Sequence, residues 1–220
     1  LFAHPNPKRV LVVGGGDAAV ISQIVKHDCV EEIVICEIDQ MVIDCARKYF
    51  PHFAKTYDHA KVTLNCGDAA EYIKNHDNYF DVIIADTSDP DGPAEALFKS
   101  PFYKDLYQAL RPGGKVATQG ECFWKDAELI TGLIKDIKAN TKFETVEYAT
   151  TQIPTYPSGS IGFILCSKPL DEANPNPATT MRKMAREIPA DFDTKFYDAE
   201  MHEAAWTSIP KFFKEVLKKL

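Results

Sequence analysis

Three carboxylates follow one apolar segment of the sequence within a few positions. The segment FDVIIAD reads as a buried strand, and Asp86, Asp89 and Asp91 fall within six positions at its end. Like charges this close repel one another, so their grouping favours a bound cation such as an organic ammonium ion. A solvated turn is the other interpretation, because Asp-Pro and Asp-Gly are ordinary turn pairs. It suits Asp91 better than Asp86, which ends the strand.

The spacing of these acids does not match a calcium loop. With Asp91 and Gly92 at loop positions five and six, Phe98 stands at position twelve, where an EF-hand has glutamate. Magnesium stays open, although no phosphate-binding motif accompanies the acids. The six cysteines and six histidines show no zinc spacing. We therefore expect no metal ion, and six reduced thiols in a reducing compartment.

A glycine-rich segment could bind a nucleoside. In VVGGGDAAV, Gly14, Gly16 and Ala19 have the spacing G-x-G-x-x-[GA] between an apolar run and a helical one. Glu37 ends the next apolar run, where an acid suits ribose hydroxyls. Asp17 stands beside the glycines and would repel a pyrophosphate. The loop therefore favours a nucleoside without phosphates, such as one that carries a cationic sulfonium, over NAD.

A third acid, Asp68, follows the next apolar run in CGDAA. A helix N-cap is an equally good interpretation of Asp68, and Asp17 can be only a favourable charge in a first helical turn. The carboxyl ends of parallel strands meet at one edge of a sheet, where ligands of open α/β folds bind. Asp17, Glu37, Asp68 and Asp86 are therefore expected at a common crevice.

The elements that must position these acids alternate between strands and helices, which predicts a doubly wound parallel sheet. The connector PTYPSG between the last two strands is too short for a parallel crossover, so that pair should be antiparallel. The predicted fold class is α/β: a doubly wound, mostly parallel seven-stranded sheet with one antiparallel strand near the edge, as in S-adenosylmethionine-dependent methyltransferases. The expected strands are 9–13, 31–39, 61–66, 80–86, 115–120, 143–153 and 160–167. The expected helices are 17–27, 40–49, 69–75, 101–110, 126–139, 200–206 and 210–220. The segment RPGG at 111–114 is expected to be a turn.

Length and charge limit the organisation and the partners. A chain of 220 residues suits one sizeable domain. We interpret 1–220 as a single Rossmann-like domain, with 169–177 as a linker and 178–220 as a C-terminal helical segment. The net charge of −7 argues against a nucleic-acid partner. No apolar run reaches membrane-spanning length, so we expect no membrane partner and a cytoplasmic location.

The chain resembles the spermidine synthases, which are aminopropyltransferases. The resemblance runs through HPNPKRVLVVGGGD, CEID, CGD, ADTSDP-x-GPAE-x-LF, TQGE, IPTYPSG-x-IGF and FYDAEMHEAAW, and covers nearly the whole chain. Enzymes of this family move the aminopropyl group of decarboxylated S-adenosylmethionine onto putrescine, and they release spermidine and methylthioadenosine. The resemblance implies a co-substrate and no cofactor, and it implies a homodimer. Family members also carry an N-terminal β domain before this region, which we expect to be absent here.

The resemblance implies roles for the residues that match. Glu37 matches the acid at the ribose hydroxyls, Asp68 the acid at the adenine, and Asp86 the catalytic base. The implied donor-binding residues are Gly14, Gly16, Asp17, Glu37, Asp68 and Ala69, and the implied putrescine-binding residues are Asp17, Asp89 and Tyr156. Gln119 and Glu121 lie in the matching TQGE motif.

The sequence departs from the family pattern at three small residues. Ala18, Ala19 and Ala69 stand where the family has glycine. With the missing domain, these changes leave two alternatives open. One is a putrescine N-methyltransferase that uses intact S-adenosylmethionine, which Asp17 disfavours because it would lie near the donor carboxylate. The other is a non-catalytic homologue that binds a nucleoside or a partner subunit, which the retained base and diamine residues disfavour.

Overall fold

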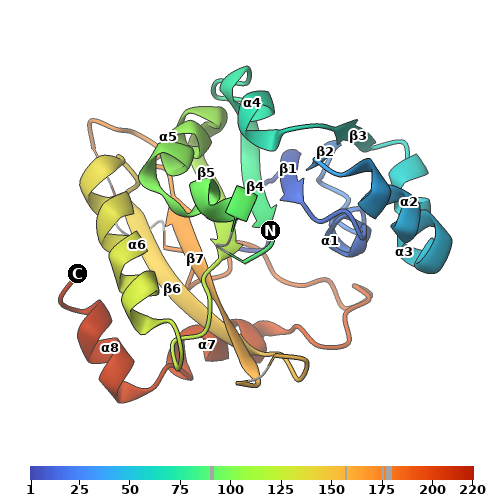
Figure 1. The fold of residues 1–220 in the computed structure, drawn as a ribbon. Coiled ribbons are helices and arrows are strands. Elements are labelled where there is room, and N and C mark those ends of the chain that lie inside the picture. The colour runs from blue at the N-terminus through green and yellow to red at the C-terminus, as the bar shows by residue number, and fades with distance from the viewer. Residues whose placement is uncertain (90–91, 157, 175, 177–179) are drawn as a thin grey trace.

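A seven-stranded sheet forms the centre of the structure (Figure 1). The structure is a computed structural model, and it describes residues 1–89, 92–156, 158–174, 176 and 180–220. The strand order is β3-β2-β1-β4-β5-β7-β6; β7 is antiparallel to both its neighbours and the other pairs are parallel. The predicted fold class is therefore confirmed. The strands are β1 (Arg9–Gly14), β2 (Glu32–Glu37), β3 (Val62–Cys66), β4 (Phe80–Asp86), β5 (Leu110–Gln119), β6 (Thr145–Gln152) and β7 (Ser160–Ser167).

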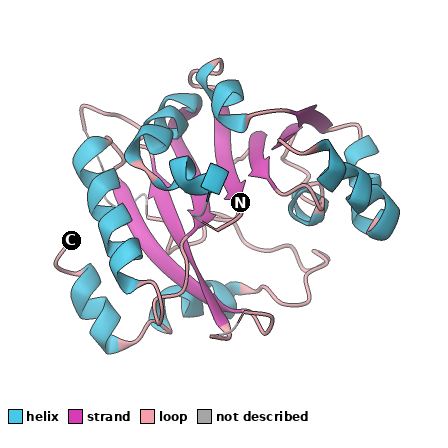
Figure 2. Cartoon of the chain, viewed as in Figure 1, coloured by secondary structure: helices cyan, strands magenta, loops and turns pink. Residues whose placement is uncertain are grey.

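Helices cover both faces of this sheet (Figure 2). One face packs against α4, α5, α6 and α8, and the other packs against α1, α2 and α3 over the first strands and against α7 beside β6. The α-helices are α1 (Ala19–Ile24), α2 (Gln40–Tyr49), α3 (Pro51–Ala54), α4 (Ala69–Lys74), α5 (Ser100–Ala109), α6 (Ala127–Asn140), α7 (Ala199–Thr207) and α8 (Lys211–Leu217), and the 3-10 turns are η1 (Lys55–Asp58) and η2 (Gly92–Phe98).

The first strand shows why the sheet is buried on both sides. Leu11 and Val13 belong to the core cluster under α4, α5 and α6, whereas Val10 and Val12 belong to the cluster under α1, α2 and α3. All four are at most 2% exposed. Successive side chains of a strand point to opposite faces, and a parallel sheet covered on both faces takes an apolar run. The sequence RVLVV therefore reads as a central strand, which is where it lies.

The first helix is shorter than predicted. The sequence favours a helix over 17–27, but α1 runs only over Ala19–Ile24. Ala18 has a φ of 66°, in the left-handed region, so the helical backbone cannot begin before it. The sequence hides this because glycine usually signals such a conformation, and alanine stands here.

The segment RPGG is not a separate turn before a strand, as the sequence predicts, but part of β5. Leu110 already pairs with Phe80, and the next pair is Lys115 with Val82. The intervening residues 111–114 form an irregularity in the strand, where Gly113 adopts a φ of 80°. The irregularity lies at the end of β5 remote from the acid cluster.

The end of the chain returns to the sheet. Helices α7 and α8 lie where the sequence predicts the last two helices, and 180–198 forms no helix or strand. The predicted linker 169–177 falls partly outside the described residues, which omit 175 and 177. Within the described part of the chain, no helix is long and apolar enough to cross a membrane.

Candidate active site

The carboxyl ends of β1 and β4 meet where the strand order reverses direction. From β1 the chain builds outward through β2 to β3, and it then returns to add β4 on the other side of β1. Ligands of open α/β sheets bind at such a switch point. Gly14 pairs in register with Asp86 across it, so the glycine loop and the acidic loop start side by side.

The glycine loop is held to the main chain of Asp86. Gly14 has a φ of 75°, and a Cβ atom on it would stand 2.2 Å from the carbonyl oxygen of Asp86. The amide of Gly15 donates to that same oxygen at 2.9 Å. Only glycine at position 14 allows this approach. The loop after β1 therefore sets where the last residue of β4 lies.

The next glycine positions Glu37. The amide of Gly16 donates to Oε2 of Glu37 at 3.1 Å, and a Cβ atom on Gly16 would come within 2.5 Å of that oxygen. The amide of Asp39 donates to Oε1 at 3.0 Å. Glu37 is 8% exposed, so these two amides compensate a buried carboxylate at the end of β2.

Tyr57, in η1, supports this loop from behind. Its hydroxyl donates to the carbonyl oxygen of Gly16 at 2.5 Å, and its ring is 5% exposed. Burial, followed by the charges of Asp17 and Glu37, raises the pKa of Tyr57 to about 12, so it remains a donor at neutral pH. The sequence analysis did not identify Tyr57, because a tyrosine in a polar segment outside any motif carries no signal.

Asp68 has the local role that the sequence offered as an alternative, an N-cap, whereas Asp17 lies in the turn before α1 and not in its first helical turn. Oδ1 of Asp17 accepts from the amide of Ala19 at 2.8 Å, and Oδ1 of Asp68 caps α4 by accepting from the amide of Ala70 at 2.8 Å. Both aspartates are exposed at the sheet edge that carries Glu37. Their turns are thus explained without a ligand, and their ligand contacts stay predictions.

The methyl group of Ala18 does not face this edge. Ala18 is fully buried in the core cluster beneath α1. The methyl group that Ala18 has in place of the family's glycine therefore packs in the core and not where a ligand would approach. Ala69, at the start of α4, is 8% exposed and also packs in the core.

Asp86 is half-buried, and the pKa of its carboxyl group is raised. Burial and the charge of Asp17 raise its pKa, Glu37 adds to the rise, and a hydrogen bond from Gln119 opposes it. That bond runs from Nε2 of Gln119 to Oδ1 of Asp86 at 3.2 Å. A carboxylate whose pKa is raised is a better proton acceptor near neutral pH.

Tyr156 is the residue predicted for the second half of the site. Burial, followed by the charges of Asp89, Glu121 and Asp86, raises the pKa of Tyr156. These three carboxylates come from the end of β4, from the loop that follows it and from the loop after β5, and their charges act on one tyrosine. Asp91, expected to serve only the turn, lies outside the described residues. Glu121 was singled out in the sequence by its motif alone.

This arrangement suits an organic cation next to a nucleoside. Carboxylates favour the charged form of a bound amine. Within the described ranges, no group of three or more His, Cys, Asp or Glu side chains could hold a metal ion. Ile38, which follows Glu37, is 69% exposed and offers an apolar surface for a flat ring, which the sequence analysis missed. In the sequence its only signal is an isoleucine that directly follows Glu37.

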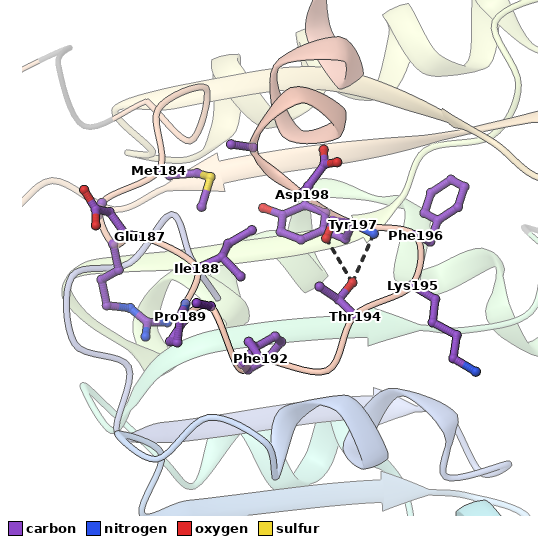
Figure 3. A pocket seen from close by; sticks show the side chains of 14 residues that line it. Met184, Glu187, Ile188, Pro189, Phe192, Thr194, Lys195, Phe196, Tyr197 and Asp198 are labelled. Atoms are coloured by element: carbon purple, nitrogen blue, oxygen red, sulfur yellow. Dashed lines mark hydrogen bonds between the residues drawn. The ribbon is translucent and has the colours of Figure 1, made fainter.

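Two cavities help to delimit the site. A shallow apolar cavity of about 330 Å³ borders Asp17 and Asp39 and is lined by Met41, Val42 and Phe50, among others. A wider cavity of about 750 Å³ is lined only by residues of 184–199 (Figure 3). None of the predicted site residues borders the wider cavity, so it is not part of this site.

Comparison with known proteins identifies close relatives. Residues 1–175 match the model of the spermine/spermidine synthase domain family. The chain is 44% identical to a spermidine synthase of Schizosaccharomyces pombe and 45% identical to one of Dictyostelium discoideum, over 100% and 96% of its length and 71% of theirs. A crystal structure of spermidine synthase in complex with the transition-state analogue AdoDATO superposes with a TM-score of 0.82, at 33% identity, over 100% of this chain and 72% of that one.

Proposed function

The chain belongs to the spermine/spermidine synthase family, and we propose that it transfers the aminopropyl group of decarboxylated S-adenosylmethionine to putrescine. The products are spermidine and methylthioadenosine. One observation carries the proposal: a half-buried carboxyl group with a raised pKa, Asp86, lies at the sheet's switch point, joined through main chain to a glycine loop. The relatives that share this fold are named spermidine synthases.

The donor is assigned to the glycine-loop side. Glu37 would accept hydrogen bonds from the ribose hydroxyls, because its carboxylate is already oriented by the amides of Gly16 and Asp39. Asp68 would lie at the adenine with Ala69 beside it, and Gly14 and Gly16 would line the donor from the loop after β1. The carboxylate of Asp17 would bind the aminopropyl amine and would repel the carboxylate of an intact donor. The sulfonium needs no pyrophosphate site, which agrees with an acid beside the glycines.

The acceptor is assigned to the Tyr156 side. Putrescine is a dication at neutral pH, because an alkylammonium has a pKa of about 10. Asp89 and Tyr156 would hold it, and Asp86 would receive the proton from the attacking end. The charges that raise the pKa of Tyr156 also make this part of the crevice negative. An acidic pocket both attracts a diamine and keeps its distal end protonated.

The reaction is a direct displacement. The deprotonated amine attacks the methylene carbon next to the sulfonium, a C–N bond forms, and the C–S bond breaks with its electron pair going to sulfur. The proton passes to the carboxylate of Asp86, and the sulfur leaves as a neutral thioether. The sulfonium is already an activated leaving group, so the protein supplies alignment and a base. The donor is a co-substrate, and the proposal requires no cofactor.

The organisation of the protein is also proposed. We keep the homodimer, the cytoplasmic location and the single Rossmann-like domain over 1–220 as predictions. All six cysteines, each within a described range, are unpaired, which supports a reducing compartment. Sedimentation velocity would test the dimer: a single species at twice the mass of 24.6 kDa is expected, and a monomer at micromolar concentration would contradict it.

Product analysis tests the reaction. The protein is incubated with putrescine and with either decarboxylated or intact S-adenosylmethionine, and the products are identified by mass spectrometry. Spermidine and methylthioadenosine in equal amounts from the decarboxylated donor are expected. N-methylputrescine from the intact donor would assign a methyltransferase instead. Methylthioadenosine binding without any product would assign a non-catalytic homologue.

A further inference from the structure

Glu121 lies in the loop after β5 and has an unusual backbone. Its φ is 52°, in the left-handed region, which glutamate rarely adopts. Gly120, just before it, leaves no space for a side chain: a Cβ atom there would stand 2.8 Å from the carbonyl carbon of Phe163. A strained residue persists only where its surroundings hold it, and such residues cluster at functional sites. The contacts that hold Glu121 in this left-handed conformation therefore bear on the site.

Two donors converge on the carbonyl oxygen of Glu121. The hydroxyl of Tyr148, in β6, donates to it at 2.8 Å, and the amide of Gly162, in β7, donates to it at 2.8 Å. The amide of Gly120 in turn donates to the carbonyl oxygen of Gly162 at 2.8 Å. The loop is therefore bound to the antiparallel end of the sheet through one side chain and two main-chain bonds.

Tyr148 reaches this carbonyl because Gly162 has no side chain. A Cβ atom on Gly162 would stand 2.0 Å from the hydroxyl oxygen of Tyr148. The ring is 3% exposed and makes an edge contact with Phe213 of α8, with 5.3 Å between the ring centroids. Burial raises the pKa of Tyr148 well above its ordinary value, so the hydroxyl remains a donor throughout the neutral range.

The loop that these bonds hold carries Glu121 and begins directly after Gln119, the last residue of β5. Gln119 donates to the carboxylate of Asp86, and the charge of Glu121 acts on Tyr156. Cys122, the next residue, contacts the hydroxyl of Ser160 at 3.4 Å, which adds a second attachment to β7. A shift of the loop would move Glu121 and the end of β5 that carries Gln119, whereas Glu37 ends β2 and Gly16 lies in the loop after β1.

We propose that Tyr148 is a positioning residue for the amine acceptor: its hydroxyl, with the amide of Gly162, holds Glu121 in its left-handed conformation and thereby fixes Gln119 and Glu121 beside Asp86 and Tyr156. This inference rests on the proposed function. It assigns the effect to the acceptor half of the site, because the donor half is held by the glycine loop and Tyr57. The hydroxyl therefore matters for catalysis although it touches no reacting atom.

The test compares Tyr148→Phe with Tyr107→Phe. Tyr107 is a close match: it is 5% exposed, its hydroxyl donates to Glu172 at 2.8 Å, and its ring makes an edge contact with Phe143 at 5.1 Å. We expect Tyr148→Phe to raise the KM for putrescine on the order of tenfold, the effect of one lost hydrogen bond to a buried acceptor. The KM of the donor and the Kd of methylthioadenosine should stay at their wild-type values in both variants.

A double variant shows whether the hydroxyl acts through Glu121. If it does, adding Tyr148→Phe to Glu121→Gln should raise the KM for putrescine by less than it does in the wild type, since contacting residues are non-additive. Full additivity, or an equal loss in donor affinity, would overturn the inference. So would a Tyr148→Phe variant that behaves like Tyr107→Phe. Wild-type protein that makes no spermidine would instead overturn the proposed function, and the wild-type rate separates the two failures.

Discussion

The amide of Gly15 donates a hydrogen bond of 2.9 Å to the main-chain carbonyl of Asp86. The loop proposed for the nucleoside and the residue proposed as the base are thus parts of one hydrogen-bonded unit, formed where β1 and β4 lie side by side in register. A change in the glycine loop should therefore affect both halves of the reaction.

We expect Gly14→Ala to be severely destabilising. Its Cβ atom would overlap the carbonyl oxygen of Asp86 at 2.2 Å, and alanine would also have to adopt a φ of 75°. Gly159→Ala is the matched control, because Gly159 has a φ of 70° but open space around its Cβ position. The control should lose about 1 kcal/mol of unfolding free energy, and Gly14→Ala more than about 3 kcal/mol. Urea-induced unfolding measures both, and equal losses would contradict the packing argument.

Glu37→Gln should weaken the binding of the nucleoside. Removing the charge loses charge-assisted hydrogen bonds to the ribose, which predicts a Kd for methylthioadenosine that is roughly 10- to 100-fold higher. Glu32→Gln is the control, because Glu32 lies at the opposite end of β2 and binds Tyr79. Isothermal titration calorimetry gives both constants. An unchanged Kd for Glu37→Gln would remove Glu37 from the donor site.

The pH dependence of the reaction should respond to Gln119. The base works as a carboxylate, so activity should fall as the pH falls through the pKa of Asp86, which burial and Asp17 raise above 3.8. Gln119→Met removes a hydrogen bond that lowers this pKa. The acid limb of kcat/KM for putrescine should therefore move to higher pH.

Gln108→Met, at an exposed position of α5, is the control for this shift and should leave the acid limb in place. The profiles are measured at saturating donor, so that only the acceptor step is followed. If the acid limb of Gln119→Met lies at the wild-type pH or at a lower pH, the pKa of Asp86 does not determine the acid limb.

The order of the elements could be predicted because each β-strand is an apolar, β-branched run. RVLVV and FDVIIAD fit only buried strands once the intervening segments read as helices. The antiparallel position of β7 followed from a connector too short for a crossover. The start of α1 could not be predicted, because Ala18 adopts a conformation that its residue type disfavours.

The positions of the acidic residues of the candidate site could be predicted from the sequence, but the residues that hold the neighbouring loops in place could not. Glu37 and Asp86 end apolar runs, so their place at the sheet edge follows from topology alone. Tyr57 and Tyr148 act through contacts between residues that are distant in the chain. No local pattern encodes such a contact, because it depends on how the strands and loops finally pack.

The central claim is that Asp86 is the base of an aminopropyl transfer. Asp86→Asn keeps the shape of the side chain and removes the carboxylate. Burial raises the pKa of Asp86 in the folded protein, so the native state binds its proton more tightly than the unfolded state does. The ionised carboxylate therefore lowers stability at neutral pH, and the variant should melt no lower than wild type at pH 7.

The most direct measurement is the rate of spermidine formation from putrescine and decarboxylated S-adenosylmethionine by the wild type, by Asp86→Asn and by the control Asp77→Asn, an exposed aspartate. Asp86→Asn should be slower by about 10²- to 10⁴-fold with an unchanged Kd for methylthioadenosine, and Asp77→Asn should match the wild type. A rate for Asp86→Asn equal to that of the wild type would contradict the account.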